Sequence, residues 1–304
     1  MKLLALADLV SALVCPNCRG GELSAQQDSA RCERCGTTYR DDSGVLSFLI
    51  PGHLDATNLG EIKGNTFPDS YVERMLEKEE WNPLLTEQMR WVVRIVDEMI
   101  PANRDRLYAL GAGTGFDLRL LLRHRTFSQV FASDISPAAT ALIARALAGY
   151  PGELGLFASE FSRCPAPRGE RNAGLVFQAL HHAPDAHAAL DALLEHNFDD
   201  LVIVEPLTNM VFGVLAKFDL VQRVEYTGTR PDWLDMRRIT QIASRRAYRV
   251  VTRTWWEVPP YLAPPWLVSR PAAWRGVYRF FDSVSRTTNL IRLGSMAAIH
   301  FARS

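Results

Sequence analysis

The sequence lacks several features that would assign it quickly to a class of protein. No run of eighteen apolar residues occurs, which disfavours a membrane-spanning helix. Only four of the 34 basic residues are lysine, and 34 acidic residues bring the formal net charge to zero. A broadly basic nucleic-acid binder and an acidic tail are therefore both disfavoured. What is present is a chain of 304 residues, long enough for about two domains of ordinary size.

Charge is unevenly placed along the chain, although it sums to zero. Residues 230–304 contain 13 arginines and four acidic residues, a net charge of +9, so the remainder carries −9. This asymmetry is compatible with an anionic ligand or a polyanionic partner near the C-terminal third. We favour the simpler interpretation, in which the two regions pair across a domain surface, because charges mostly form solvated faces.

The N-terminus joins one lysine to an apolar stretch, so a secretory or lipoprotein signal has to be considered. Asp8 interrupts that stretch, and Val14 stands where a cleavage site favours a small residue. Cys15, which a lipoprotein signal would use, belongs to a different cysteine pattern. We therefore expect a cytosolic protein.

Four of the five cysteines form two Cys-x2-Cys pairs. Cys15 and Cys18 are followed, after thirteen residues, by Cys32 and Cys35. Each pair places two thiolates on one tight turn, and two such turns supply the tetrahedral sulfur set that zinc prefers. Disulfides are disfavoured in the cytosol, and a redox-active pair would leave the second pair unexplained. The spacing therefore predicts one structural zinc ion.

The residues around these pairs fit a compact metal-binding module. We expect Gly20, Gly21 and Gly36 to supply the positive φ that turns require. The fifth cysteine, Cys164, is expected to be a buried, inert thiol. The segments LVCPNCRGGEL and ARCERCGTTYRDDSGVLSFL together resemble the zinc-ribbon module related to the tRNA-methyltransferase activator protein, over about residues 11–50.

A connector with little apolar content follows the ribbon. Residues 53–69 are rich in Gly, Asn, Asp and Pro, which predicts a linker or a lid. Residues 71–80 are polar and are expected to form a helix. A second helix is predicted after Pro83, ending before Pro101. Its apolar stripe recurs at spacings of three and four, at Leu85, Met89, Val92, Val96 and Met99.

A glycine-rich turn follows a short apolar strand at residues 107–110. Gly111, Gly113 and Gly115 lead into an apolar helix, so a ligand can approach the backbone and the helix N-terminus. The next strand ends at Asp134, where a carboxylate can bind the two hydroxyls of a ribose. The dinucleotide fingerprint places its third glycine one residue later, and here that position is Phe116.

This G-x-G-x-G pattern resembles motif I of the class I S-adenosylmethionine-dependent methyltransferases, over about residues 105–304. The resemblance implies an α/β fold, with a Rossmann-like seven-stranded methyltransferase sheet and the zinc ribbon as an N-terminal domain. The expected division is 1–52 for the ribbon, 53–104 for linker and lid helices, and 105–304 for the methyltransferase domain. An insertion at about 259–293 would separate the last two strands, an antiparallel pair at 248–258 and 296–301.

The same resemblance implies a cofactor site. Glu160 would accept from the adenine amine, the backbone N–H of Phe161 would face a ring nitrogen, and Gln178 would contact cofactor or acceptor. The implied cofactor-binding set is Gly111, Gly113, Gly115, Asp134, Ile135, Glu160, Phe161 and Gln178. Two positions depart from the family pattern, since Ala109 and Gly174 stand where relatives often carry acids that help organise the cofactor edge.

Candidate catalytic residues follow two further strands, predicted at residues 174–179 and 201–206. His181, His182 and Glu205 lie at strand C-termini, where open α/β sheets place their ligands. One histidine could act as a base, although capping the next helix or packing beneath the cofactor is the simpler role. Glu205 could hold a cationic acceptor or bond to backbone. Aromatic residues in the 259–293 insertion predict a roof over an acceptor pocket, with packing on the sheet or a dimer face as alternatives.

Three functions from different classes remain open. The first is methyl transfer to a small-molecule N or O acceptor, using S-adenosylmethionine and one structural zinc ion. The second is ribosomal RNA guanine methylation, because those enzymes also place a zinc ribbon before a class I domain. Only Lys63 supplies positive charge between the end of the ribbon and Tyr71, which counts against RNA. The third is a non-catalytic binding protein, supported only by Ala109 and Gly174. No membrane partner is expected.

Overall fold

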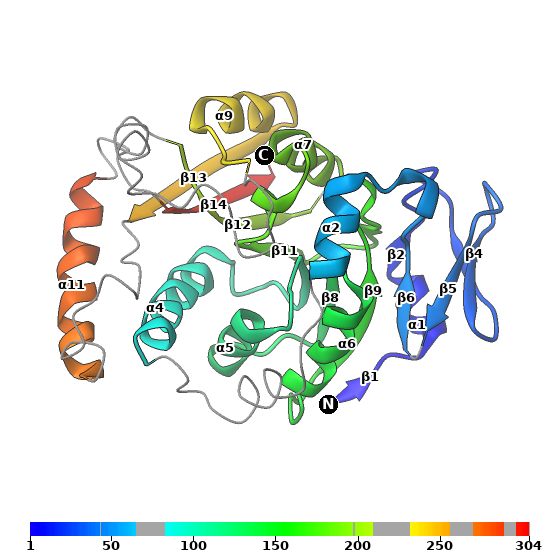
Figure 1. The fold of residues 1–304 in the computed structure, drawn as a ribbon, viewed down its shortest axis with the longest axis horizontal. Coiled ribbons are helices and arrows are strands. Elements are labelled where there is room, and N and C mark those ends of the chain that lie inside the picture. Colours follow the sequence, from blue (N-terminus) through cyan, green and yellow to red (C-terminus); the bar gives the residue numbers. More distant parts are fainter. Residues whose placement is uncertain are drawn as a thin grey trace.

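A single large sheet forms the centre of the protein. The structure, a computed structural model, describes residues 1–42, 44–64, 83–196, 198–208, 232–255, 270–288 and 296–303. Twelve strands belong to the sheet, and eleven of them follow the order β13-β14-β12-β11-β7-β8-β9-β6-β5-β4-β3. The N-terminal strands lie at one end of this sheet and β13 lies at the other (Figure 1).

Seven strands make up the predicted Rossmann-like part. Five are mutually parallel: β7 (Arg106–Leu110), β8 (Gln129–Asp134), β9 (Glu153–Ala158), β11 (Asn172–Phe177) and β12 (Asp200–Pro206). The strand β14 (Met296–Arg303) runs antiparallel to β12, and β13 (Tyr248–Trp255) runs antiparallel to β14. The predicted α/β fold class is confirmed, and so is the antiparallel pair at the end of the sheet.

Helices cover both faces of this sheet. One face packs against α4 (Pro83–Met99), α5 (Phe116–His124) and α6 (Pro137–Ala146), and the other against α1 (Leu6–Ser11), α7 (Ala186–Glu195) and α9 (Met236–Arg245). Successive strand residues alternate between these two cores: Leu107 and Ala109 belong to the first, and Tyr108 and Leu110 to the second. A further helix, α11 (Pro271–Thr288), packs against α4 and β13 (Figure 1).

The N-terminal strands are β1 (Lys2–Leu3), β2 (Leu13–Val14), β3 (Leu23–Ala25), β4 (Ser29–Cys32), β5 (Thr38–Asp42) and β6 (Val45–Ser47). All of them except β2 continue the large sheet. Both β1 and β6 pair in parallel with β9, so two N-terminal segments cover the edge that β9 would otherwise expose. A separate short pair joins β2 to β10 (Ala166–Pro167).

The hydrophobic core also crosses from the ribbon into the main fold. Phe48 follows β6, is almost fully buried, and donates its backbone N–H to the Ala158 carbonyl at 2.8 Å. Its ring lies between Tyr39 of the ribbon and Phe157 of β9, at centroid distances of 4.8 and 5.8 Å. The ribbon is therefore held by side-chain packing as well as by strand pairing.

The connector contains two short helical elements. A 3-10 turn, η1 (Pro51–His53), precedes α2 (Ala56–Gly64), and Asp55 accepts from the Asn58 N–H at 2.8 Å. The helix predicted at 71–80 lies outside the described residues, whereas α4 occupies the predicted position and ends at Met99. None of the described helices has the length and apolar content that a bilayer crossing requires.

Candidate functional site

A cavity of about 440 Å³ lies at the carboxyl edge of the parallel strands, beneath α2. Chain segments that follow β7, β8, β9 and β11 meet there, as expected for an open α/β sheet. Of the sequence-predicted residues, the cavity lining includes Gly111, Gly113, Asp134, Ile135, Glu160, Phe161, Gln178 and His182. It does not include Gly115, His181 or Glu205.

Glycine is needed at each of the three positions of the glycine-rich turn for a different structural reason. All three have positive φ, at 65° for Gly111, 54° for Gly113 and 82° for Gly115. A Cβ on Gly111 would lie 2.6 Å from the Cβ of Ala179, whereas one on Gly113 would meet no atom within 4 Å. Gly113 is therefore the position at which a ligand can approach the backbone. Gly115 is the N-cap of α5, and a Cβ there would contact Ile143 of α6 at 3.3 Å, so this glycine lets the two helices pack closely.

Asp134 ties the end of β8 to the glycine-rich turn. Its carboxylate accepts from the backbone N–H of Gly113 at 2.9 Å and from that of Ser136 at 2.9 Å. Burial raises the pKa of the Asp134 carboxyl, the nearby Glu61 charge raises it further, and the two amides oppose this effect. Each carboxylate oxygen has a second lone pair, so a ribose hydroxyl can still be bound.

Glu160 lies after β9, beside the 3-10 turn η2 (Phe161–Arg163). Asn58 donates its side-chain amide to Glu160 Oε2 at 3.1 Å, and Arg163 Nε lies 3.5 Å from Oε1. An amide N–H of Asn58 therefore already donates to the carboxylate that the family resemblance assigns to adenine. The chemistry of this carboxylate suits an exocyclic amine.

Gln178 occupies a strained position at the end of β11. Its φ is +49°, which is uncommon for a residue other than glycine, and its N–H donates to the Val204 carbonyl at 2.7 Å. Strain of this kind concentrates at ligand sites, where the surrounding structure enforces it. Gln178 lines the cavity, as its predicted role requires.

The three candidate catalytic residues lie in two different environments. His182 lines the cavity, and its Nδ1 lies 3.4 Å from Glu61 Oε1 of α2. His181 Nδ1 instead lies 2.6 Å from Oε2 of the fully buried Glu205. The other oxygen of Glu205 accepts from the Ala179 N–H at 2.9 Å and the Leu180 N–H at 2.7 Å. Glu205 thus bonds to backbone, one of the two roles considered from the sequence, and fixes the segment between Gln178 and His182.

Helix α2 supplies cavity residues that the sequence did not single out. Asn58 and Glu61 are three positions apart, so they share one helical face, and both are only 6% exposed. His53 and Asp55 also line the cavity. The sequence indicated a linker or lid here, but nothing in its composition identified which polar side chains face inward.

The two departures from the family pattern both have packing explanations. Ala109 is 3% exposed and belongs to the apolar core beneath α4 and α5. A Cβ on Gly174 would lie 2.7 Å from Leu201 Cδ1 and 3.2 Å from the Phe198 ring. Neither residue lines the cavity, so an acid at either position would be buried among apolar side chains.

The predicted roof over an acceptor pocket lies mostly outside the described residues. Within residues 270–288, none of the side chains that the structure describes lines the cavity. The roof therefore stays a prediction.

Cys15, Cys18, Cys32 and Cys35 converge at one point of the ribbon, with their sulfur atoms within 4.8 Å of one another. The Cys15–Cys35 and Cys18–Cys32 sulfur distances are 3.7 and 3.6 Å. A disulfide needs about 2.05 Å, whereas four sulfurs around a zinc ion at about 2.3 Å lie roughly 3.8 Å apart. The spacing fits a tetrahedral metal site.

The surroundings of the sulfur cluster support the same interpretation. A Cβ on Gly21 would lie 2.3 Å from Cys32 Sγ and 2.9 Å from Cys18 Sγ, so only glycine fits against the cluster. Of the ribbon glycines expected to have positive φ, Gly36 does at 73°, but Gly20 and Gly21 do not. Glycine is required at position 21 because the cysteine sulfur atoms lie too close for a side chain, and not because of its backbone conformation. Cys164 is buried as predicted, which raises the pKa of its thiol to about 12.

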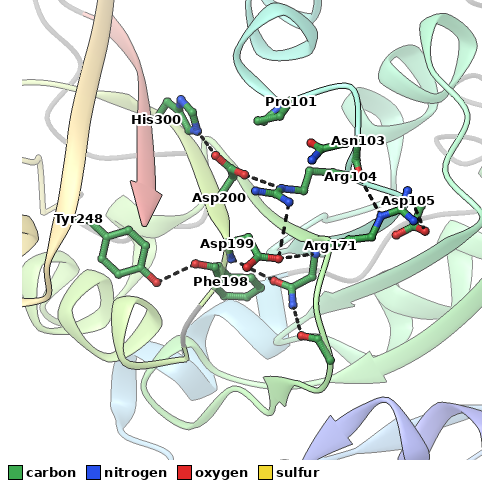
Figure 2. Close-up of polar contacts among 12 residues, drawn as sticks. Pro101, Asn103, Arg104, Asp105, Arg171, Phe198, Asp199, Asp200, Tyr248 and His300 are labelled. Carbon is green, nitrogen blue, oxygen red and sulfur yellow. Dashed lines mark hydrogen bonds and ion pairs between the residues drawn. The ribbon is translucent and has the colours of Figure 1, made fainter. Parts of the chain in front are cut away.

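A second polar cluster lies at the opposite, amino edge of the parallel strands (Figure 2). Asp200 begins β12 and lies 2.5 Å from His300 Nε2 and 2.6 Å from Arg104 Nε. Asp199 accepts from the Asn172 N–H at 3.0 Å, which joins the starts of β11 and β12. Burial acts to raise the pKa of the Asp200 carboxyl, but the bonds from His300 and Arg104 outweigh it and lower that pKa. This network joins the starts of neighbouring strands, at the edge of the sheet opposite the cavity.

Comparisons with known proteins give likenesses of structure but none of sequence. No protein-family model matches the chain, and no curated protein sequence matches it. Magnesium protoporphyrin IX methyltransferase from Synechocystis PCC 6803, solved with bound S-adenosylmethionine, aligns at 14% identity with a TM-score of 0.49. That alignment covers 84% of this chain and 100% of the other.

Two further solved structures show a similar extent of likeness. A chain from the complex between the Haloferax volcanii Trm112 methyltransferase activator and a methyltransferase aligns at 13% identity and a TM-score of 0.49, over 78% of this chain and 96% of the other. The [4+2]-cyclase SpnF aligns at 13% identity and a TM-score of 0.45, over 72% and 81%. These are likenesses of fold alone.

Proposed function

We propose that this protein is an S-adenosylmethionine-dependent methyltransferase that acts on a small-molecule N or O acceptor. One observation carries the proposal: the open backbone at Gly113, the Asp134 carboxylate and the Glu160 carboxylate line a single cavity at the carboxyl edge of the sheet. These groups match the parts of the cofactor, because carboxylates can accept from ribose hydroxyls and from the adenine amine. When bound, the cofactor supplies an electrophilic methyl group on a sulfonium.

The roles of the chain's own residues follow from their positions. Asp134 would bind the ribose, Glu160 and Phe161 the adenine, and the turn from Gly111 to Gly113 would leave room for the rest of the cofactor. Gln178 and His182 line the same cavity and would position the acceptor, with His182 able to accept a proton from it. His181 and Glu205 would act indirectly, by holding the segment that presents His182.

The four ribbon cysteines would hold one structural zinc ion. They leave no coordination position open for chemistry, so the ion would stabilise the ribbon rather than take part in the reaction. Tyr39 and Thr37 support this set, since their hydroxyls lie 3.2 Å from Cys15 Sγ and Cys35 Sγ respectively.

Native mass spectrometry followed by an acceptor screen tests the proposal. Purified protein should retain one zinc ion and bind S-adenosylmethionine or its demethylated product. With cofactor labelled in the methyl group, label should pass to at least one member of a panel of amines, phenols and carboxylates. A protein that binds zinc but no nucleoside would instead be a non-catalytic relative.

Transfer to RNA is a second candidate, favoured by one observation. Residues 236–255 contain six arginines and no acidic residue, and Arg237, Arg238, Arg245 and Arg249 are exposed. Such a surface can contact phosphates. Fluorescence anisotropy with a structured RNA hairpin would distinguish the two candidates: methylated RNA, with binding that weakens steeply as salt rises, would favour this one.

A further inference from the structure

We infer that the methyl acceptor carries an anionic group, a phosphate or a carboxylate, and that Arg237 and Arg238 of α9 bind this group in a groove beside the cofactor cavity. The inference rests on the proposed function and deepens it, because it names the chemical class of the acceptor. The groove has a volume of about 1010 Å³, and residues of α7 and α9 line it.

The groove adjoins the cavity across the start of α7. Asp185 and Ala188 line both of them, so the two spaces are neighbours that share one wall. His182 lines the cavity and stands three residues before Asp185, which is at most about 11 Å along the chain. A small acceptor whose reacting atom lies beside His182 can therefore place a second group in the groove.

Two hydrogen bonds hold the start of α9 against the start of α7. The Asp235 N–H donates to His187 Nε2 at 3.0 Å, and the Ala186 N–H donates to the Asp232 carboxylate at 2.9 Å. The two arginines follow in the first turn of α9, and both line the groove. These bonds therefore keep the arginines beside the wall that the groove shares with the cavity.

The guanidinium groups of these two arginines are open to a ligand. Arg237 and Arg238 are exposed, and neither forms an ion pair with any residue that the structure describes. Arg246, at the other end of α9, is by contrast paired with Asp191 and Glu195 of α7. Guanidinium donors match the oxygens of a phosphate or a carboxylate in both charge and geometry.

Carboxylates in the same groove limit the size of the anion. Asp185 and Asp191 both line it and stand six positions apart along α7, which is about 9 Å. A nucleic-acid backbone carries a charge at every phosphate and would meet these carboxylates, whereas one anionic group can lie against the guanidiniums alone. The groove thus favours a small anionic acceptor over RNA.

Calorimetry with inorganic pyrophosphate tests the groove without any turnover. At low ionic strength, pyrophosphate should bind the wild-type protein saturated with S-adenosylhomocysteine, and the double variant Arg237→Gln/Arg238→Gln should bind it about tenfold more weakly or worse. The matched control is Arg31→Gln/Arg249→Gln, which removes two exposed arginines outside the groove and should leave the affinity unchanged. Pyrophosphate that does not bind the wild type, or that binds both double variants equally, would overturn the inference.

Labelled methyl transfer tests the class of the acceptor. The probe is S-adenosylmethionine labelled in the methyl group, supplied with an extract of small metabolites and with total RNA. Labelled small products should be retained by an anion-exchange resin, and phosphatase treatment should release phosphates from that retention but not carboxylates. The groove variant should raise the KM for the retained acceptor about tenfold and leave kcat within about twofold.

Three outcomes of this assay would contradict the inference. Label confined to unretained small products, label in RNA alone, or an unchanged KM in Arg237→Gln/Arg238→Gln would each overturn it. Failure of the proposed function is a separate result, because a wild-type protein that bound no S-adenosylhomocysteine would refute that function, while the pyrophosphate titration would still report on the groove.

Discussion

Asp134 shows how one side chain can shape a loop and bind a ligand at the same time. Its two backbone hydrogen bonds hold the glycine-rich turn against the end of β8. The same carboxylate is buried in a cavity that also contains Glu61, and both effects disfavour its negative charge, so a further donor beside the two amides would stabilise it. A ribose hydroxyl is such a donor.

Replacement of Asp134 by Asn should therefore weaken S-adenosylhomocysteine binding by about tenfold or more. A charge-assisted hydrogen bond contributes about 1.5–3 kcal/mol, and the amide offers only one acceptor oxygen to three donors. Isothermal titration calorimetry would measure the change, with the exposed ribbon residue Asp28→Asn as a control that leaves affinity unaltered. Equal affinity in Asp134→Asn and wild type would remove Asp134 from the site.

His196 predicts a pH dependence of stability that is separate from the cavity. Burial lowers the pKa of its imidazole to about 4, whereas an unfolded histidine has a pKa near 6.5. The unfolded chain therefore binds a proton first as pH falls. Neutral His196 makes its full contribution to the free energy of unfolding above about pH 6.5. As the pH falls from about 6.5 to 4, the free energy of unfolding decreases by up to about 3 kcal/mol.

His196→Leu should flatten the loss of unfolding free energy across that pH window. Urea denaturation at half-unit pH steps would show it, and the exposed His124→Asn should leave the wild-type slope unchanged. A His196→Leu profile that falls as steeply as the wild type would assign the acid sensitivity to other groups.

At the scale of elements, the ribbon and β9 depend on each other. The buried ribbon residues share a core with the main fold, and strand β6 of the ribbon covers the edge of β9. If the cysteine cluster fails to close, β6 loses the turn geometry that places it beside β9.

Cys32→Ser should lower bound zinc well below one ion per chain and expose residues 1–50 to limited proteolysis. Elemental analysis and mass spectrometry of the fragments would report both effects. Cys164→Ala is the matched control, because Cys164 is a buried cysteine outside the cluster, and it should keep full zinc content. Full zinc content in Cys32→Ser would show that the assigned ligands are wrong.

The elements also show which parts of the structure the sequence could predict. The strands at β7, β8, β12 and β14, the glycine-rich turn and the convergence of four cysteines follow from local patterns, since apolar runs, glycine spacing and cysteine spacing are readable within short windows. The contacts of Glu61 and Asn58 are not local. They join α2 to residues more than a hundred positions away, and no periodicity records such a pairing. The separate roles of His181 and His182, adjacent in sequence, likewise depend on which of them faces Glu205.

At the scale of the whole molecule, the shared sheet and core predict one unfolding transition. Phe48 is buried between ribbon and main fold, so Phe48→Ala should cost about 3–5 kcal/mol and lower the melting temperature of the entire chain. Differential scanning calorimetry would show a single shifted peak. Phe280→Ala is the control, because that ring is 66% exposed and its loss should change stability by about 0.5 kcal/mol or less. Two peaks, of which only one moves, would show that the ribbon unfolds independently.

The pairing of β6 with β9 also imposes an order on how the chain is made. Leu46 pairs with Phe157, so the partner of the ribbon's last strand leaves the ribosome about 110 residues after the strand itself. At 5–20 residues per second the ribbon waits roughly 5–20 seconds for that partner. All four cysteines emerge before this interval begins. A newly made chain can therefore acquire its metal first, and the finished ribbon then offers a ready edge with which β9 can pair.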